Sequence, residues 1–119
     1  MAGGAALTDL QAWALAFALT QLVELPVYRA IARVRWWQAF SLSLVTHPLV
    51  WFSFPGLYDR GWLSWTAMTC VAEAFAYATE AAMLRGAGVR WPRAILASCA
   101  ANTASIAAGA LTRALWGVP

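Results

Sequence analysis

Two carboxylates and one phenol share a side of the apolar stretch 71–84. Glu73 and Glu80 are seven residues apart, and Tyr77 lies between them, four residues after the first and three before the second. A helix of about 3.6 residues per turn projects all three from one face. An ionised carboxylate near the centre of a bilayer costs about 2.5–3.5 kcal/mol, so such a group normally faces protein or water. We therefore expect this face to carry the chemistry of the chain.

The other apolar stretches contribute polar groups that suit the same chemistry. Glu24 lies in the first stretch, His47 is the only histidine and lies in the second, and Asn102 and Ser105 lie in the last. Carboxylates and imidazole exchange protons, and amides and hydroxyls can hydrogen-bond such groups. The sequence thus predicts a ligand- or ion-binding site made of Glu24, His47, Glu73, Tyr77, Glu80, Asn102 and Ser105.

Three of these residues, His47, Glu73 and Glu80, also form a candidate set of metal ligands. Imidazole nitrogen and carboxylate oxygen are the ligands of hydrolytic zinc sites. No His-Glu-x-x-His motif is present, so the ligands would have to come together from different helices. A divalent metal is compatible with the sequence, and the cofactor is left open.

The composition is typical of a membrane protein. Of the 119 residues, 62% are hydrophobic and 11% are charged, whereas soluble domains average about 45–50% and about 25%. The net charge of +3 comes from arginine without any lysine. Most arginines gather in short connections rather than on an aromatic-studded surface, so we expect no nucleic-acid partner. The expected partner is the lipid bilayer.

Four apolar stretches are each about as long as a bilayer requires, roughly 20 residues. The connections between them are short and rich in Arg, Gly or Pro. The sequence therefore predicts an all-α integral membrane protein, an antiparallel bundle of four transmembrane helices. A single transmembrane domain, residues 1–119, would hold spans at about residues 7–28, 36–54, 62–84 and 94–116.

The arginines predict which way this bundle faces. The first and third connections carry three arginines each, whereas the second carries only Arg60 beside Asp59. Because positive residues favour cytoplasmic connections, we expect a multipass protein of the cell inner membrane with both termini outside the cytoplasm.

The same topology predicts how deep each polar residue lies. We count along each span from its cytoplasmic end at about 1.5 Å per residue. Two polar layers result, a middle one of His47, Glu73, Asn102 and Ser105 and a more cytoplasmic one of Glu24, Tyr28, Glu80 and Ser98. All four spans contribute, as a shared interior site requires.

Small residues mark one face of the last span. They recur at spacings of three and four, and the series is Ser98, Ala101, Asn102, Ser105, Ala108 and Gly109. Small-xxx-small spacing lets helix backbones approach closely, so this face suits packing within the bundle, a homodimer or another membrane subunit. Cys70 and Cys99 lie about 12 Å apart in depth, too far for an intrachain disulfide.

Four motifs together resemble a group of small bacterial four-helix membrane proteins over nearly the whole chain. They are Glu24-x-Pro26-x-Tyr28, Thr46-His47-Pro48-x-x-Trp51, Glu73 with Glu80, and Asn102-x-x-Ser105-x-x-x-Gly109. The resemblance implies the fold but supplies no activity. A distant similarity links the chain to CAAX-protease-like intramembrane peptidases, which also place glutamate, histidine and asparagine inside spans. Their adjacent glutamate pair and second histidine are absent here.

Three functions are compatible with such a site. The first is binding or moving a small ligand, proton or cation, with Glu73 and Glu80 as exchanging carboxylates and His47 as their partner. The second is an intramembrane hydrolase in which these three residues hold a metal or activate water. The third is a non-catalytic subunit of a larger membrane complex, whose polar residues only fix helix packing. Enzymatic activity is left open, and we favour the first because carboxylates at two depths can form a path as well as a site.

Overall fold

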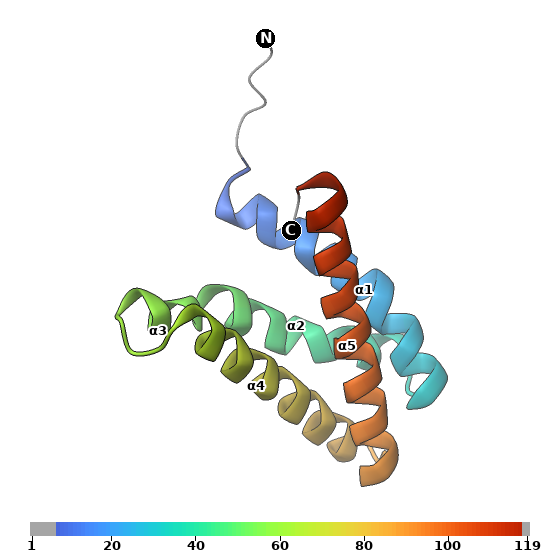
Figure 1. Ribbon diagram of the computed structural model, residues 1–119. Coiled ribbons are helices and arrows are strands. Elements are labelled where there is room, and N and C mark those ends of the chain that lie inside the picture. Colours follow the sequence, from blue (N-terminus) through green and yellow to red (C-terminus); the bar gives the residue numbers. More distant parts are fainter. Residues whose placement is uncertain (1–6, 118–119) are drawn as a thin grey trace.

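The described part of the chain, residues 7–117 of a computed structural model, is helical apart from short connections (Figure 1). Its elements are, in order, α1 (Asp9–Ile31), α2 (Trp36–Phe52), α3 (Pro55–Asp59), α4 (Trp65–Gly86) and α5 (Trp91–Trp116). The short helix α3 has 5 residues. The predicted all-α fold is confirmed, and the four long helices lie within a few residues of the four apolar stretches.

Local sequence accounts for most helix ends. α1 begins at a capping box in which the Thr8 hydroxyl accepts the Gln11 N–H and the Gln11 amide oxygen accepts the Thr8 N–H. α4 begins behind Ser64, whose hydroxyl accepts a first-turn N–H. α5 has Pro92 in its first turn, where the backbone N–H that proline lacks would have no partner within the helix. It ends at Gly117, whose φ of 65° is left-handed.

Two prolines lie inside helices without ending them. α1 continues past Pro26 and α2 continues past Pro48. Each proline therefore removes one backbone hydrogen bond but leaves the flanking turns helical. α1 consequently extends to Ile31, beyond the predicted boundary at residue 28. Its continuation is stopped at Arg33, which takes a left-handed φ of 58°.

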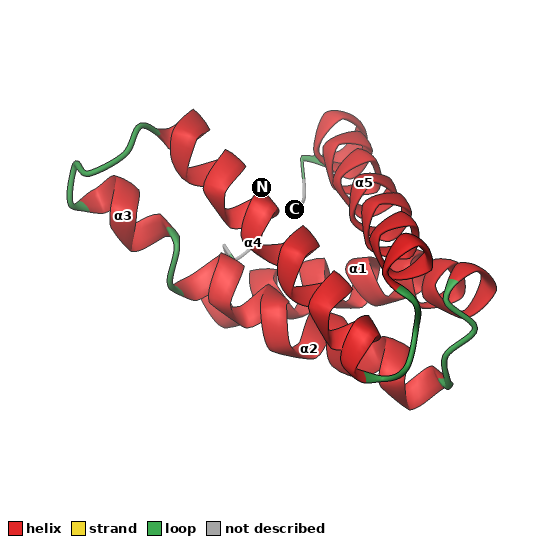
Figure 2. Cartoon of the chain, turned by 90° about the horizontal axis from the view of Figure 1, so that it is seen from below, coloured by secondary structure: helices red, strands yellow, loops and turns green. Residues whose placement is uncertain are grey.

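The four long helices form a ring. α1 packs against α2 and α5, and α4 packs against the same two helices, while the diagonal pairs α1/α4 and α2/α5 make no close backbone contact. Neighbouring helices run antiparallel. Figures 1 and 2 show that α4 and α5 meet beside the connection 87–90 and diverge away from it. The ring is therefore narrow where the connections 32–35 and 87–90 lie and wide toward the other end.

The apolar core lies at the narrow end, which we call the packed end. Its members are Tyr28, Ala32, Val34, Ala39, Leu42, Leu84, Val89, Ala94, Ala97 and Ala101. Three alanines of α5, at positions 94, 97 and 101, are fully buried, so this part of the predicted small-residue face does pack within the bundle. Gly109, farther along the same helix, has open space where a side chain would project. Close packing thus stops before the wide end.

Polar side chains lie inside the ring and large apolar side chains lie outside. The buried polar residues are Thr20, Glu24, Ser43, Thr46, Glu80, Ser98 and Asn102. The exposed side chains include Leu22 at 75%, Leu96 at 60% and Leu111 at 57% of their full surface. This distribution is the reverse of the usual one in water-soluble proteins. Cys70 and Cys99 are both exposed and free, as expected.

Two helices of the described chain, α1 and α5, are long and apolar enough to cross a membrane, as judged by length and composition. α2 has 17 residues, and α4 carries both Glu73 and Glu80. The membrane association predicted from the sequence is supported to this extent, and the four spans stay a prediction.

Candidate functional site

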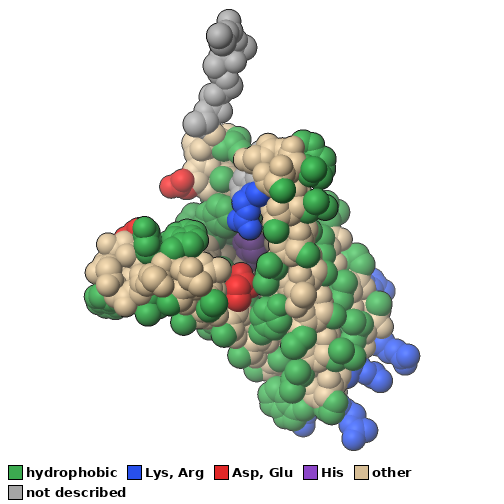
Figure 3. All heavy atoms as spheres, viewed as in Figure 1, with side chains coloured by type: hydrophobic (Ala, Val, Ile, Leu, Met, Phe, Trp, Pro, Cys, Tyr) green, Lys and Arg blue, Asp and Glu red, His purple; other side chains and the backbone are tan. Residues whose placement is uncertain are grey.

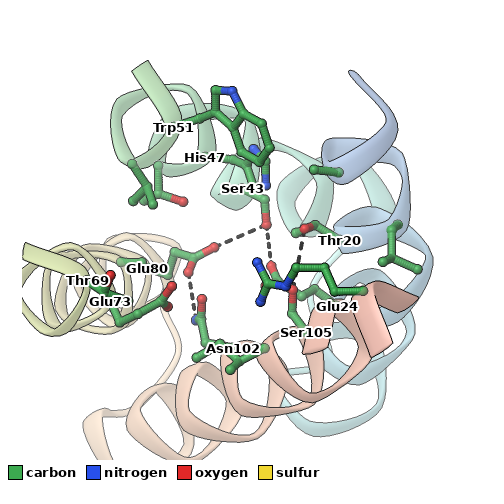
Figure 4. Close-up of a pocket in the computed structure, with 18 residues that line it drawn as sticks. Thr20, Glu24, Ser43, His47, Trp51, Thr69, Glu73, Glu80, Asn102 and Ser105 are labelled. Carbon is green, nitrogen blue, oxygen red and sulfur yellow. Dashed lines mark hydrogen bonds between the residues drawn. The ribbon is translucent and has the colours of Figure 1, made fainter. Parts of the chain in front are cut away.

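Two buried carboxyl groups meet at one hydroxyl in the middle of the ring. Ser43 of α2 hydrogen-bonds a carboxyl oxygen of Glu24 on α1, and its Oγ lies 3.2 Å from Oε1 of Glu80 on α4 (Figure 4). Glu24 is 3% exposed, and Glu80 and Ser43 are each 1% exposed. Three helices thus contribute to a contact whose side chains are almost entirely buried.

The number of protons limits how this contact can be made. A serine hydroxyl carries one hydrogen and can donate only one hydrogen bond, although it can accept two. An ionised carboxylate can only accept. Both contacts of Ser43 are hydrogen bonds only if one of the two carboxyl groups carries a proton and donates it. The geometry therefore fits a pair that shares one proton between Glu24 and Glu80.

Asn102 of α5 completes the site from the fourth helix. Its Nδ2 lies 2.7 Å from Oε2 of Glu80, 3.0 Å from the Ser98 carbonyl oxygen and 3.3 Å from the Tyr28 hydroxyl. The amide has two N–H groups. One can donate to Glu80, and the second is shared between the Ser98 carbonyl oxygen and the Tyr28 hydroxyl. Tyr28 is fully buried in the apolar core, so it connects the site to the packed end.

A second polar contact joins α1 and α5 farther from the packed end. The Ser105 and Thr20 hydroxyl oxygens are 3.4 Å apart. Figure 4 shows both residues beside Glu24, on the inner side of their helices. Ser105 thus belongs to the site as predicted, while Thr20 and Ser43 are additions. Their spacing in the sequence indicates both. Thr20 lies four residues before Glu24 and shares its helix face, and Ser43 lies four residues before His47 and shares the face of His47.

His47 lies in an aromatic cluster at the edge of the site. Its ring centroid is 5.6 Å from that of Phe17 and 6.1 Å from that of Trp51, with the Trp51 ring nearly parallel. The ring centroid of Trp13 is 6.3 Å from that of His47. The Nδ1 atom of His47 is buried and has no hydrogen-bond partner, so the imidazole has an unused polar atom beside the carboxyl pair.

A cleft of about 270 Å³ opens above these residues, between the diverging helices. The polar residues that line it include Thr20, Glu24, Ser43, His47, Glu80, Asn102 and Ser105. Glu73 and Arg113 also line it, nearer the open end. Glu73 is half-buried and Arg113 is exposed. Figure 3 shows the hollow, with acidic, basic and histidine side chains visible inside it. The predicted convergence of Glu24, His47, Glu73, Glu80, Asn102 and Ser105 on one cavity is thus observed.

Tyr77 is the predicted site residue that does not line this cleft. Its hydroxyl lies 2.7 Å from the Thr103 hydroxyl, at an exposed contact between α4 and α5. At about 100° per residue, Tyr77 is offset by about 40° from Glu73 and about 60° from Glu80, both in the same direction. That offset turns the phenol away from the cleft toward the outer side of α5.

The predicted metal set is not assembled. Within residues 7–117, no group of three or more His, Cys, Asp or Glu side chains is placed to hold a metal ion. His47, Glu73 and Glu80 do line the same cleft. However, Glu73 and Glu80 are separated by about 10 Å of helix rise. Side chains two turns apart cannot easily converge on one ion.

The two predicted layers also need one change. Asn102 was expected beside His47 and Glu73, but it hydrogen-bonds Glu80 and Tyr28 of the other layer. Counting along each span treats the helices as parallel, whereas α4 and α5 diverge from the connection 87–90 (Figure 1), so side chains counted at different depths can meet. Asn102 therefore belongs to the layer nearer the packed end.

No family model, no curated protein and no solved structure matches the chain. The resemblance to small bacterial four-helix membrane proteins consequently stays a prediction.

Proposed function

We propose that this protein spans a membrane with its four long helices and binds a small monovalent cation in the cleft in exchange for a proton. The observation that carries the proposal is the contact of one hydroxyl, that of Ser43, with the two buried carboxyl groups of Glu24 and Glu80. Carboxyl groups inside membrane helices are characteristic of proton and ion pathways.

The distribution of side chains supports the membrane location. Each long helix turns large apolar residues outward, for example Leu22, Leu49, Val71 and Leu111. Such broad apolar exposure in water would promote association, whereas in lipid it is the favourable arrangement. The polar groups inside the ring would in turn be shielded from the hydrocarbon.

The arginines support an orientation. Six of them lie at the packed end and all six are exposed, namely Arg29, Arg33, Arg35, Arg85, Arg90 and Arg93. The positive-inside rule places this end in the cytoplasm. The cleft would then open away from the cytoplasm, as would both termini in an inner membrane.

Charge balance supports an exchange of one proton for one monovalent cation. With the shared proton, the pair of Glu24 and Glu80 carries one negative charge. Loss of that proton leaves two charges, and one bound monovalent cation restores the original total. The oxygen atoms of both carboxyl groups and of Ser43 are the kind of ligand that hard cations prefer. Glu73, nearer the open end of the cleft, provides a second carboxyl group on the way in.

Proton release on addition of salt tests this proposal. The purified protein in weakly buffered detergent solution is mixed with Na⁺, K⁺ or Li⁺ chloride, and a pH-sensitive dye reports the protons released. We expect about one proton for each cation bound with at least one of these ions, and none with N-methylglucamine. Glu24→Gln and Glu80→Gln should each abolish the release, because the amide N–H replaces the acid proton as donor to Ser43 and the remaining carboxylate then has no proton to release.

The matched control is Asp59→Asn, which removes an exposed acid in α3, away from the cleft. Its proton release should equal that of the unaltered protein. Release that persists in both glutamine variants, or its absence with all three cations, would contradict the exchange.

The same hydrogen bonds favour a second candidate, a non-catalytic subunit whose polar residues fix helix packing. The observation behind it is that Glu24, Ser43, Glu80 and Asn102 link all four long helices. Under this alternative, Glu80→Gln would lower stability without altering any response to cations or protons. Unfolding measured beside proton release therefore separates the two functions.

A further inference from the structure

From the surface of the packed end we infer that the groove between the end of α1 and the start of α5 binds the headgroup of an anionic phospholipid. The groove has a volume of about 520 Å³ and is lined by Ile31, Arg90, Pro92, Arg93 and Leu96. It lies outside the ring and shares no residue with the cleft. The inference rests on the proposed membrane location and is independent of cation exchange.

The charge of this surface has no counterpart within the chain. Six arginines are exposed at the packed end, and the chain has five acidic residues. Glu24 and Glu80 are buried in the site, Glu73 lines the cleft, and Asp9 and Asp59 lie in the first turn of α1 and in α3. The packed end therefore presents positive charge alone, which an external anion would balance (Figure 3).

The groove concentrates this charge beside an apolar wall. Arg90 and Arg93 carry guanidinium groups, which bind phosphate oxygens through paired N–H donors. Ile31, Pro92 and Leu96 form the rest of the lining, and Leu96 is 60% exposed. A ligand that combines a phosphate with an adjoining apolar chain matches both parts.

The surroundings select a lipid over a soluble phosphate. Trp91 beside the groove is half exposed, as are Trp36 and Trp37 on the neighbouring helix, and tryptophan collects at the level of lipid headgroups. The groove would lie at that level on the cytoplasmic side, where basic pockets between helices hold anionic headgroups. The positive-inside rule explains arginines in both connections, but not why two of them share a groove with an apolar wall.

Retention of lipid by the purified protein tests the inference. The protein is incorporated into nanodiscs of phosphatidylcholine mixed with phosphatidylglycerol and released into detergent, and native mass spectrometry counts the phosphatidylglycerol that stays bound. The variant Arg90→Gln with Arg93→Gln should lose about thirtyfold in apparent affinity for phosphatidylglycerol. Phosphatidylcholine, which has no net charge, should show no comparable change.

The matched control is Arg29→Gln with Arg85→Gln, which removes the same charge from the same end outside the groove. We expect its loss of affinity to stay below about threefold, because exposed charges beyond the contact are screened. An equal loss in both double variants would overturn the groove and leave only diffuse attraction. Complete displacement of the lipid by inorganic phosphate would overturn the lipid as ligand.

Three further measurements keep the outcomes separate. All four substituted arginines are exposed, so melting temperatures of both double variants should match that of the unaltered protein. Flotation with vesicles tests membrane location by itself. Proton release on cation addition should be unchanged in both double variants, so failure of the lipid site and failure of the exchange are distinguishable.

Discussion

The two ends of the ring differ in what fills the space between the helices. At the packed end, alanines of α5 let it approach its neighbours, and Tyr28 and Leu84 fill the remaining volume. Toward the open end, the same helix carries Ser105 and Gly109 and lines a cleft. The packed end is held by close contact of apolar surfaces, whereas next to the cleft the helices are joined by hydrogen bonds between polar groups. Substitutions at the two ends should therefore act by different mechanisms.

The largest expected effect is on packing, from Ala97→Leu. Ala97 is fully buried, so a larger side chain must displace α5 from its neighbours. Overpacking of this kind costs about 1–3 kcal/mol, and we expect a loss of that size in the free energy of unfolding, measured in detergent with a titrated denaturant.

Gly109→Ala is the matched control on the same helix. Nothing lies within 4 Å of the side chain that would be added, and alanine favours a helix over glycine by about 1 kcal/mol. We expect no loss in the free energy of unfolding, and a gain of up to about 1 kcal/mol. A loss at Gly109 equal to that at Ala97 would show that the two ends are packed alike.

The next effect is on the polar contact, from Asn102→Ala. The substitution removes the amide donor from Glu80 and from Tyr28. Hydrogen bonds between helices in a membrane contribute about 1–2 kcal/mol in model peptides, and the free energy of unfolding should fall by that amount. Thr103→Ala, which removes only the exposed contact with Tyr77, should cost less than about 0.5 kcal/mol. Equal losses in the two variants would argue against a special role for the buried network.

A smaller effect is expected for the coupling between Ser43 and Glu24. Ser43→Ala, Glu24→Gln and the double variant form a cycle that isolates the energy of their contact. Measured contacts of this kind in a membrane protein average about 0.6 kcal/mol and reach about 1.7 kcal/mol. We expect a value in the upper part of this range, obtained from unfolding curves of the four proteins. A coupling energy of zero would remove the basis for the shared proton.

The smallest effect on stability is expected for His47→Phe. The imidazole has a buried Nδ1 without a partner, so phenylalanine keeps the aromatic contacts with Phe17 and Trp51 and removes an unsatisfied atom. The free energy of unfolding should change by less than about 0.5 kcal/mol. If the variant is markedly less stable, His47 holds the structure rather than lining a binding site. Proton release from the same sample shows whether His47 takes part in the exchange.

The number of long helices and the inward face of most polar residues could be predicted from the sequence, because each depends on one helix at a time. Runs of apolar residues fix where the helices lie, and spacing along a helix fixes which residues share a face. That is why Glu24, His47, Glu73 and Glu80 were expected in one cavity. The same rule puts Tyr77 on the face of Glu73 and Glu80. Within a face about 100° wide, however, Tyr77 is still rotated by about 40–60° from the two glutamates, which is enough to turn the phenol outward.

The partners of each polar residue could not be predicted, because they depend on how the helices are placed against one another. Asn102 hydrogen-bonds Glu80 and Tyr28, which a count along each helix puts in another layer, because α4 and α5 are inclined to each other (Figure 1). The role of Ser43 could not be predicted, because its spacing of four residues only places it on the same helix face as His47. Its contact with two carboxyl groups requires α1, α2 and α4 to meet.

The hollow of this molecule closes at the packed end, where Tyr28 and Leu84 fill the space under the carboxyl pair. If the protein spans a membrane as proposed, a solution on the side of the cleft could reach Glu24 and Glu80, while a solution on the other side could not without parting the helices. In the proposed orientation, the pair would equilibrate with the exterior alone. The protein at rest would then report external acidity and salt without creating a leak across the membrane.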